Sequence, residues 1–101
     1  MNRKKHIFAI FEANRQELAE MGVRNIGLFG SVVRGDDTPS SDYDILVEFD
    51  DEHHNYKCFN LLCDFIEENI GDNYDLVTRQ GLSPYIGERI LHEVEYVEIA
   101  S

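Results

Sequence analysis

The sequence predicts a small domain of the α/β (α+β) class, in which helices pack on one face of a mixed sheet of three to four strands. Two short apolar runs, residues 26–29 and 45–49, bracket a polar turn punctuated by glycine. Apolar runs of this length, bounded by Gly, Pro, Ser and Asp, are typical of strands. Apolar residues recur at helical spacing over 2–21 and 56–70, and a third strand is expected at 74–78.

The connections predict how these strands pair. The strands at about 25–30 and 43–49 are separated by a turn or short helical segment at 31–35 and a loop, so we expect them to be antiparallel. A helix connects the strand at 43–49 to the strand at 74–78, and we expect these two to be parallel with a right-handed crossover.

The two ends of the chain complete the predicted order α-β-β-α-β-α. Gly22 is expected to end the first helix. Ser83 is expected to cap the last helix, with Pro84 at its first position. We leave residues 95–101 unassigned. The buried face of the last helix is expected to consist of Ile86, Ile90, Leu91 and Val94.

Length and composition limit the class of protein. The 101 residues predict one domain, 1–101, with a single modest core and no second lobe. No apolar run approaches the roughly 20 residues of a membrane span, so we expect a soluble, cytoplasmic protein. Cys58 and Cys63 lack metal-site spacing, and we expect buried free thiols in a reducing compartment rather than a disulfide.

The charge of the chain limits its partners. The formal net charge is −11, from 20 acidic and 9 basic residues. Direct nucleic-acid binding is not expected, because phosphate backbones are held by Lys and Arg patches. A nucleotide remains possible, since metal ions can supply positive charge locally. The acidic surface also suits a basic protein partner, although a solvated surface is the simpler explanation.

Three carboxylates are the main candidates for chemistry. Asp42 and Asp44 lie two residues apart at the start of a strand, with their Cα atoms roughly 6–7 Å apart and their side chains on one face. Asp75 begins the strand expected to lie alongside. Three clustered acids disfavour their own ionisation, and divalent cations relieve that repulsion. Mg²⁺ prefers carboxylate and phosphate oxygens together. The alternative is that Asp75 merely faces water at a strand end.

Gly30 and Ser31 follow the first strand. A glycine there lets a ligand approach the backbone, and the N–H groups that open the next helical turn point toward it. Gly30 and Gly35 have the spacing of the P-loop glycines, but Asp36 and Asp37 stand where a P-loop has Lys and then Ser or Thr. The sequence therefore excludes a P-loop.

Two further polar residues lie in the same segment, and each has two interpretations. Arg34 could contact a phosphate or pair with a neighbouring acid such as Asp42. Ser41 is most simply a turn residue that bonds its own backbone. The residues do not separate these alternatives.

These residues together resemble a family signature. Gly30-Ser31-x-x-Arg34-Gly35, five residues, and then Ser41-Asp42-x-Asp44 is similar to the signature of the DNA polymerase β-like nucleotidyltransferases in their minimal (MNT) form. The strand that begins at Asp75 resembles the family's third-carboxylate strand. The segment 81–91 is similar to its closing helix, so the resemblance covers nearly the whole chain.

The resemblance implies Mg²⁺-dependent nucleotidyl transfer with two metal ions and ATP as substrate. Asp42, Asp44 and Asp75 would be the catalytic and metal-binding residues, and Asp75 would also help to deprotonate the attacking hydroxyl. Gly30, Ser31, Arg34 and Ser41 would bind the nucleotide. Two ions about 3.5–4 Å apart stabilise the attacking and leaving oxygens of such a displacement.

The resemblance also implies an acceptor. Minimal members resemble the antitoxins of MNT–HEPN toxin–antitoxin pairs, which transfer AMP to a tyrosine of a HEPN toxin. We therefore expect a HEPN toxin as partner, and an oligomer formed with it. One alternative is a nucleotidyltransferase that modifies a small molecule or an RNA end with a separate substrate-binding subunit. Another is a non-catalytic partner-binding module, which would not need three clustered acids.

Overall fold

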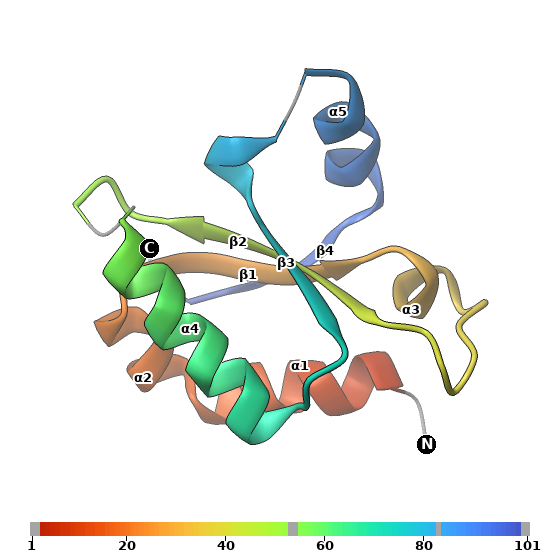
Figure 1. Cartoon of the computed structure of the whole chain (residues 1–101), viewed down its shortest axis with the longest axis horizontal. Helices are drawn as coiled ribbons and strands as arrows, with labels where there is room; N and C mark the ends of the chain where they lie inside the picture. The colour runs from red at the N-terminus through yellow and green to blue at the C-terminus, as the bar shows by residue number, and fades with distance from the viewer. Residues whose placement is uncertain (1–2, 53–54, 83, 100–101) are drawn as a thin grey trace.

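Four strands form one mixed sheet in the order β3-β2-β1-β4, flanked by helices (Figure 1). The computed structural model describes residues 3–52, 55–82 and 84–99, without the side chains of 84–86. Its elements in chain order are α1 (Arg3–Ala13), α2 (Arg15–Glu20), β1 (Val23–Phe29), α3 (Ser31–Arg34), β2 (Tyr43–Phe49), α4 (Tyr56–Asn69), β3 (Tyr74–Thr78), a 3₁₀ turn (Arg79–Gly81), α5 (Pro84–Glu93) and β4 (Glu95–Glu98).

The predicted strand pairings are confirmed. β1 and β2 are antiparallel, and β2 and β3 are parallel. The unassigned tail supplies the fourth strand, because β4 pairs antiparallel with β1. Val97 and Ile99 alternate into the core from this segment, which is the pattern of a half-buried strand.

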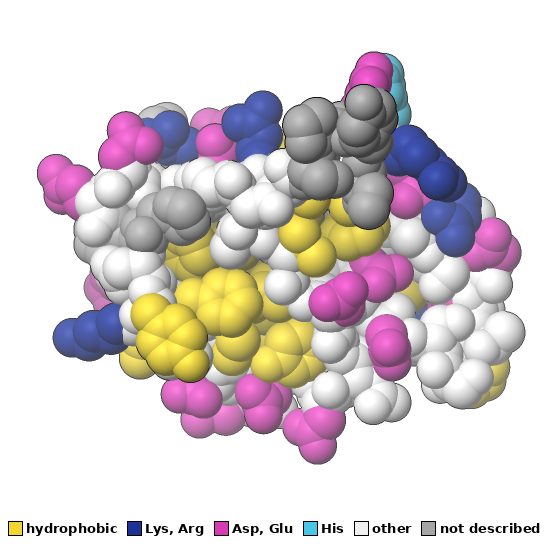
Figure 2. All heavy atoms as spheres, turned by 45° about the horizontal axis from the view of Figure 1, so that its top comes forward, with side chains coloured by type: hydrophobic (Ala, Val, Ile, Leu, Met, Phe, Trp, Pro, Cys, Tyr) yellow, Lys and Arg dark blue, Asp and Glu magenta, His cyan; other side chains and the backbone are white. Residues whose placement is uncertain are grey.

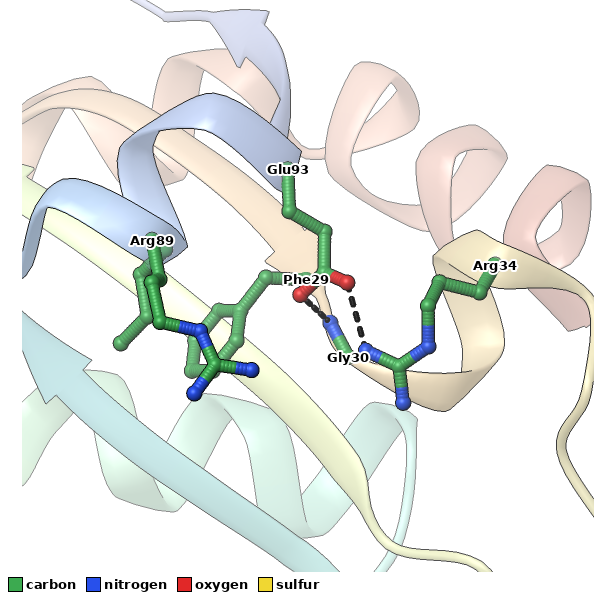
Figure 3. Close-up of a pocket in the computed structure, with 6 residues that line it drawn as sticks. Phe29, Gly30, Arg34, Arg89 and Glu93 are labelled. Carbon is green, nitrogen blue, oxygen red and sulfur yellow. Dashed lines mark hydrogen bonds and ion pairs between the residues drawn. The ribbon is translucent and has the colours of Figure 1, made fainter. Parts of the chain in front are cut away.

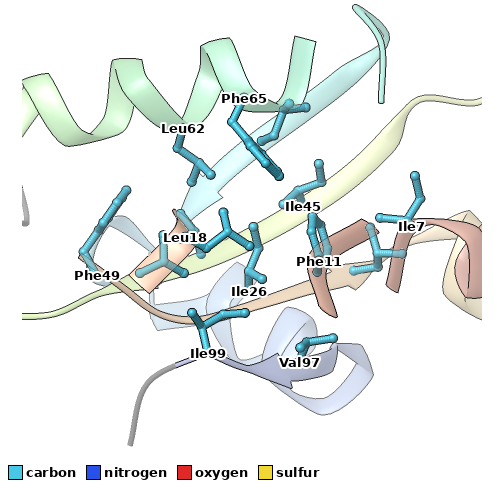
Figure 4. Packing of buried hydrophobic residues seen from close by; sticks show 14 of the residues in the cluster. Ile7, Phe11, Leu18, Ile26, Ile45, Phe49, Leu62, Phe65, Val97 and Ile99 are labelled. Carbon is cyan, nitrogen blue, oxygen red and sulfur yellow. The ribbon is translucent and has the colours of Figure 1, made fainter. Parts of the chain in front are cut away.

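One face of the sheet carries the hydrophobic core. Helices α1, α2 and α4 cover this face (Figure 1), and their apolar side chains meet those of the strands (Figure 4). Alternate residues of the central strands, such as Ile26 and Leu28 of β1, are fully buried there. The other principal members of the core are Ile7, Phe11, Leu18, Ile45, Val47, Phe49, Leu62, Phe65 and Ile66.

Helix α5 differs from the other long helices, because it lies on the opposite side of the sheet (Figure 1). Helices α1, α2 and α4 pack on one face of the sheet as expected, and α5 is the exception. The predicted burial of Leu91 is wrong, since its side chain is 40% exposed. Ile90 of α5 lines a cavity with Phe29 of β1, and Val94, which directly follows α5, lies against Gly27 of β1. Ile86 and Ser83 fall outside the described side chains.

The predicted N-terminal helix is two helices in the structure. Asn14 separates α1 from α2, and its side-chain amide donates a hydrogen bond of 2.8 Å to the carbonyl oxygen of Ile10. Asn commonly competes with the helix in this way by bonding nearby backbone groups. Leu18 of α2 is fully buried in the core, like Ile7 and Phe11 of α1.

The cysteines and the lengths of the helices bear on two expectations from composition. Cys58 and Cys63 are both free thiols, as predicted. The predicted burial is confirmed for Cys58, whereas Cys63 is only partly buried. Within the described ranges, no helix has the length and apolar character needed to span a bilayer.

Candidate active site

Asp44 and Asp75 lie side by side on neighbouring strands. The parallel register of β2 and β3 pairs these two residues directly. Tyr43 and Ile45, on either side of Asp44, contact the core, so Asp44 faces the other side of the sheet. The neighbours of Asp75 in β3 also contact the core, which turns Asp75 to the same side as Asp44. The predicted position of Asp75 beside Asp44 is confirmed, whereas the cluster of three carboxylates that includes Asp42 stays a prediction.

The charges at this position oppose one another. Burial raises the pKa of the Asp44 carboxyl, and the negative charges of Asp75 and Asp42 raise it further. Arg34 acts in the opposite direction but does not reverse the shift. None of the three carboxylates forms a hydrogen bond or ion pair with another described residue. The site thus holds negative charge that Arg34 compensates only in part, and a cation would relieve the rest.

The donor chemistry of these residues fits Mg²⁺. Three carboxylates offer only hard oxygen atoms, and Mg²⁺ is usually held by one or two carboxylates together with substrate phosphates. The described residues contain no group of three or more His, Cys, Asp or Glu that could hold a metal ion on its own. A substrate oxygen would therefore have to complete the coordination.

Gly30 closes one side of this site. It follows β1, whose last residue Phe29 pairs with Asp44, and it has a φ of 78°. A Cβ atom built on Gly30 would lie 2.1 Å from the Oδ2 atom of Asp44. Only glycine therefore accommodates both the positive φ and the close approach of the carboxylate. Ser31 follows directly as the first residue of α3.

A carboxylate from α5 binds at this glycine (Figure 3). The backbone N–H of Gly30 donates a hydrogen bond of 2.8 Å to the Oε2 atom of Glu93, while Arg34 pairs with the Oε1 atom of Glu93. The bond from Arg34 is the main cause that lowers the pKa of Glu93, and the Gly30 N–H adds to it. The same residues line a cavity of about 280 Å³, together with Phe29, Arg89 and Ile90.

Sequence reasoning missed Glu93. Its one signal is its position at the last residue of α5, where the helix dipole disfavours a negative charge. The structure explains the exception, because Arg34 and the Gly30 N–H supply the compensating positive charge. Arg34 also pairs with Asp36 at 3.3 Å. Among the described residues, Arg34 therefore does pair with acids, but these are Asp36 and Glu93 and not the expected Asp42.

The remaining predicted residue, Ser41, acts within its own loop. Its hydroxyl oxygen accepts a hydrogen bond of 2.8 Å from the N–H of Thr38. Its N–H donates to the Thr38 carbonyl oxygen at 2.9 Å. This geometry matches the turn interpretation of Ser41, and it fixes the residue that directly precedes Asp42.

The comparisons with known proteins agree with this geometry. The nucleotidyltransferase domain family matches residues 10–97. The chain is 42% identical over 94 residues to the protein adenylyltransferase MntA of Thermococcus cleftensis, which covers 92% of this chain and 94% of that protein.

Solved structures share the fold. A protein assigned as a minimal nucleotidyltransferase superposes with a TM-score of 0.70 at 30% identity, covering 86% of this chain and 92% of that one. The MNT antitoxin in complex with the tri-AMPylated HEPN toxin of Shewanella oneidensis gives a TM-score of 0.53 at 19% identity, covering 84% of this chain and 69% of that one. The second likeness shows the fold alone. The family match and the MntA identity, together with the paired carboxylates beside Gly30, establish that this chain belongs to the nucleotidyltransferase domain family and is a nucleotidyltransferase.

Proposed function

We propose that this protein transfers AMP from ATP to a tyrosine hydroxyl of a HEPN toxin, with Mg²⁺, and thereby acts as the antitoxin of the pair in the cytoplasm. The observation that carries the proposal is the direct pairing of Asp44 with Asp75 on the face where Gly30 allows close approach. The likeness to MntA, which is named a protein adenylyltransferase, supports a protein acceptor. The fold shared with an MNT antitoxin supports a HEPN toxin as that acceptor.

The roles of the residues follow from their positions. Asp42 and Asp44 would hold two Mg²⁺ ions with the triphosphate, and Asp75 would complete the second position. When bound, the metal ions supply positive charge to the attacking and leaving oxygens. The tyrosine oxygen attacks the α-phosphorus, the bond to the β-phosphate breaks, and pyrophosphate leaves. Asp75, whose side chain is exposed, would receive the hydroxyl proton.

The corner of Gly30 and Ser31, with Arg34 beside it, is proposed to receive the phosphates. That Glu93 binds there supports an affinity of this corner for anionic oxygens. A carboxylate and a phosphate cannot share the single N–H of Gly30. Nucleotide binding at this corner therefore requires Glu93 to leave, and Arg89, four residues earlier on α5, is within reach as its new partner.

The surface of the protein suits a basic partner. Figure 2 shows acidic side chains around an apolar patch on one face of the molecule. The described residues include Tyr56, 79% exposed, which lines a groove of about 340 Å³ with Phe59. Exposed aromatic side chains beside negative charge are suited to a partner that presents apolar and basic groups.

The test is transfer of label to the partner. The protein is incubated with Mg²⁺, α-labelled ATP and the HEPN protein encoded by the neighbouring gene. We expect label on a tyrosine of the partner, none from γ-labelled ATP, and none with the D42N/D44N variant. Absence of label with the folded wild-type protein contradicts the proposal. Label appearing only on an RNA end or a small molecule indicates the other transferase class, and toxin inhibition by the unlabelled variant indicates a binding module.

A further inference from the structure

Arg3 makes an unusually concentrated set of contacts with the segment that carries Asp42. Its guanidinium donates hydrogen bonds to the Oδ2 atom of Asp37 at 2.9 Å, to the carbonyl oxygen of Thr38 at 3.0 Å and to the carbonyl oxygen of Ser41 at 2.9 Å. Its Nε atom donates to the Tyr43 hydroxyl at 3.3 Å, and its Cζ atom lies 4.3 Å from the centre of the Tyr43 ring. One side chain therefore holds four residues that lie 34 to 40 positions away in the chain.

The helix that carries Arg3 is anchored in the core. Arg3 begins α1, and Ile7 and Phe11 follow at intervals of four residues on the same side of the helix. Both are fully buried in the core. The buried stripe of α1 thus fixes the position from which Arg3 reaches the loop.

Arg3 contacts the residue before Asp42 and the residue after it. Ser41 precedes Asp42, and its carbonyl oxygen is held by Arg3. Tyr43 follows Asp42, and both its ring and its hydroxyl are held by Arg3. Asp42 itself is exposed, and its negative charge acts on Asp44. If Arg3 did not hold Ser41 and Tyr43, the repulsion between the two carboxylates would favour a loop conformation in which Asp42 lies farther from Asp44.

We propose that Arg3 is a positioning residue for the cation site: by holding Ser41 and Tyr43 it keeps Asp42 beside Asp44 before any cation binds. The metal role of Asp42 rests on the proposed function, whereas the positioning itself concerns this chain alone. The planar guanidinium suits this task, because it presents several donors in a fixed arrangement and stacks on an aromatic ring. The acidic Asp37, which stands out in the motif loop, is part of the same attachment.

The test compares R3A with R15A. Arg15 is a matched control, because it is an exposed arginine on the neighbouring helix α2 whose one ion pair among the described residues is with Glu12, three residues away. We expect R3A to raise the Mg²⁺ concentration for half-maximal transfer by about tenfold, with most of the rate restored at saturating Mg²⁺. R15A should leave both quantities unchanged. The Mg²⁺ concentration for half-maximal transfer in R3K should lie between those of R3A and R15A. Lysine retains the positive charge but lacks the planar set of N–H donors of the guanidinium.

A second measurement does not depend on catalysis. Hydrogen exchange of the amides of residues 37–43 is followed in the nucleotide-free proteins, and we expect faster exchange in R3A and R3K than in R15A. Equal exchange and equal Mg²⁺ dependence in R3A and R15A overturn the proposal. If R3A does not fold, R3K is compared with R15A in its place, and equal amide exchange and equal Mg²⁺ dependence in these two variants overturn the proposal. If the wild type transfers no nucleotide, the proposed function fails, and the exchange experiment alone decides whether Arg3 positions the loop.

Discussion

The two faces of the sheet show opposite physical characters. The face under α1, α2 and α4 is continuous and apolar, and side chains such as Ile45 and Leu62 are fully buried there. The opposite face carries Asp44 against Asp75, where burial and then the charges of Asp75 and Asp42 raise the pKa of Asp44, and Arg34 offsets this only in part. Because β2 contributes to both faces with alternating residues, one strand carries the stability of the core and the charge of the site. Stability and function can therefore be perturbed separately from neighbouring positions.

The largest expected effect is on the charged face. D42N/D44N removes the proposed cation ligands and should reduce transfer by roughly 10³-fold, since preorganised charge at the reacting centre is worth this much. The free energy of unfolding should stay equal or rise, because like charges are removed. Transfer rates and denaturant unfolding measure the two quantities. A variant that loses stability in proportion to activity contradicts the separation of the two faces.

The apolar face should respond in the opposite way. Leu62→Ala leaves a cavity between α4 and the sheet and should lower the free energy of unfolding by about 2–5 kcal/mol. The rate per folded molecule should remain near that of wild type. Urea unfolding and rate measurements at low temperature separate the two effects. A specific loss of rate in the fully folded variant would mean that the core also determines the site geometry.

Two glycines allow a test at the boundary between the faces. Gly30 and Gly35 both have a positive φ, 78° and 81°, but they differ in ψ, which is −153° at Gly30 and 13° at Gly35. Alanine at Gly35 should cost about 1–2 kcal/mol, because that residue is in the left-handed helical region. The conformation of Gly30 is one that essentially only glycine adopts, so alanine should cost more there. A Cβ atom at Gly35 meets nothing within 4 Å, whereas at Gly30 it meets Asp44. We expect a larger loss of stability in G30A than in G35A, and a loss of transfer per folded molecule in G30A only. Equal activity in both variants would show that the position of Asp44 is not critical.

The smallest expected effect concerns Glu93. E93Q weakens the attachment to Arg34 and should tighten Mg-ATP binding by about fivefold, because a competing conformation is less populated. E88Q, at an exposed position of the same helix, is the control. Weaker binding in E93Q would instead indicate that Glu93 orients Arg34 for the nucleotide.

The Glu93 attachment also predicts a pH dependence. The pKa of Glu93 is lowered in the folded state, chiefly by the bond from Arg34. Its contribution to stability is therefore present above the ordinary glutamate pKa and is lost as the pH falls through the lowered value. The difference in unfolding free energy between wild type and E93Q should shrink over this acid range. A difference independent of pH would contradict the charged attachment.

Local patterns predicted most of the fold and the carboxylates. The bounds of β2 and β3 follow from short apolar runs, and their parallel pairing follows from the intervening helix, so Asp44 and Asp75 could be brought together from sequence. The alternation of β4 is only two apolar residues long, and its assignment depends on the edge that β1 offers.

The interactions between distant segments could not be predicted in this way. Glu93 lies 63 residues from Gly30, and Arg3 lies 38 residues from Ser41. Charged side chains on helix surfaces have many possible partners, and only the packed arrangement of α1 and α5 selects one. The exposure of Leu91 has the same origin, since the side of the sheet that α5 covers is a property of the whole fold.

Calorimetric titration of the protein with ATP in the presence of Mg²⁺ tests the central assignment most directly. The account predicts Mg²⁺-dependent ATP binding by the wild type, loss of this dependence in D42N/D44N, and retained dependence in Leu62→Ala under conditions where it is folded. ATP binding that is equal with and without Mg²⁺, or unchanged in D42N/D44N, would contradict the assignment of the paired carboxylates as the site of metal and nucleotide.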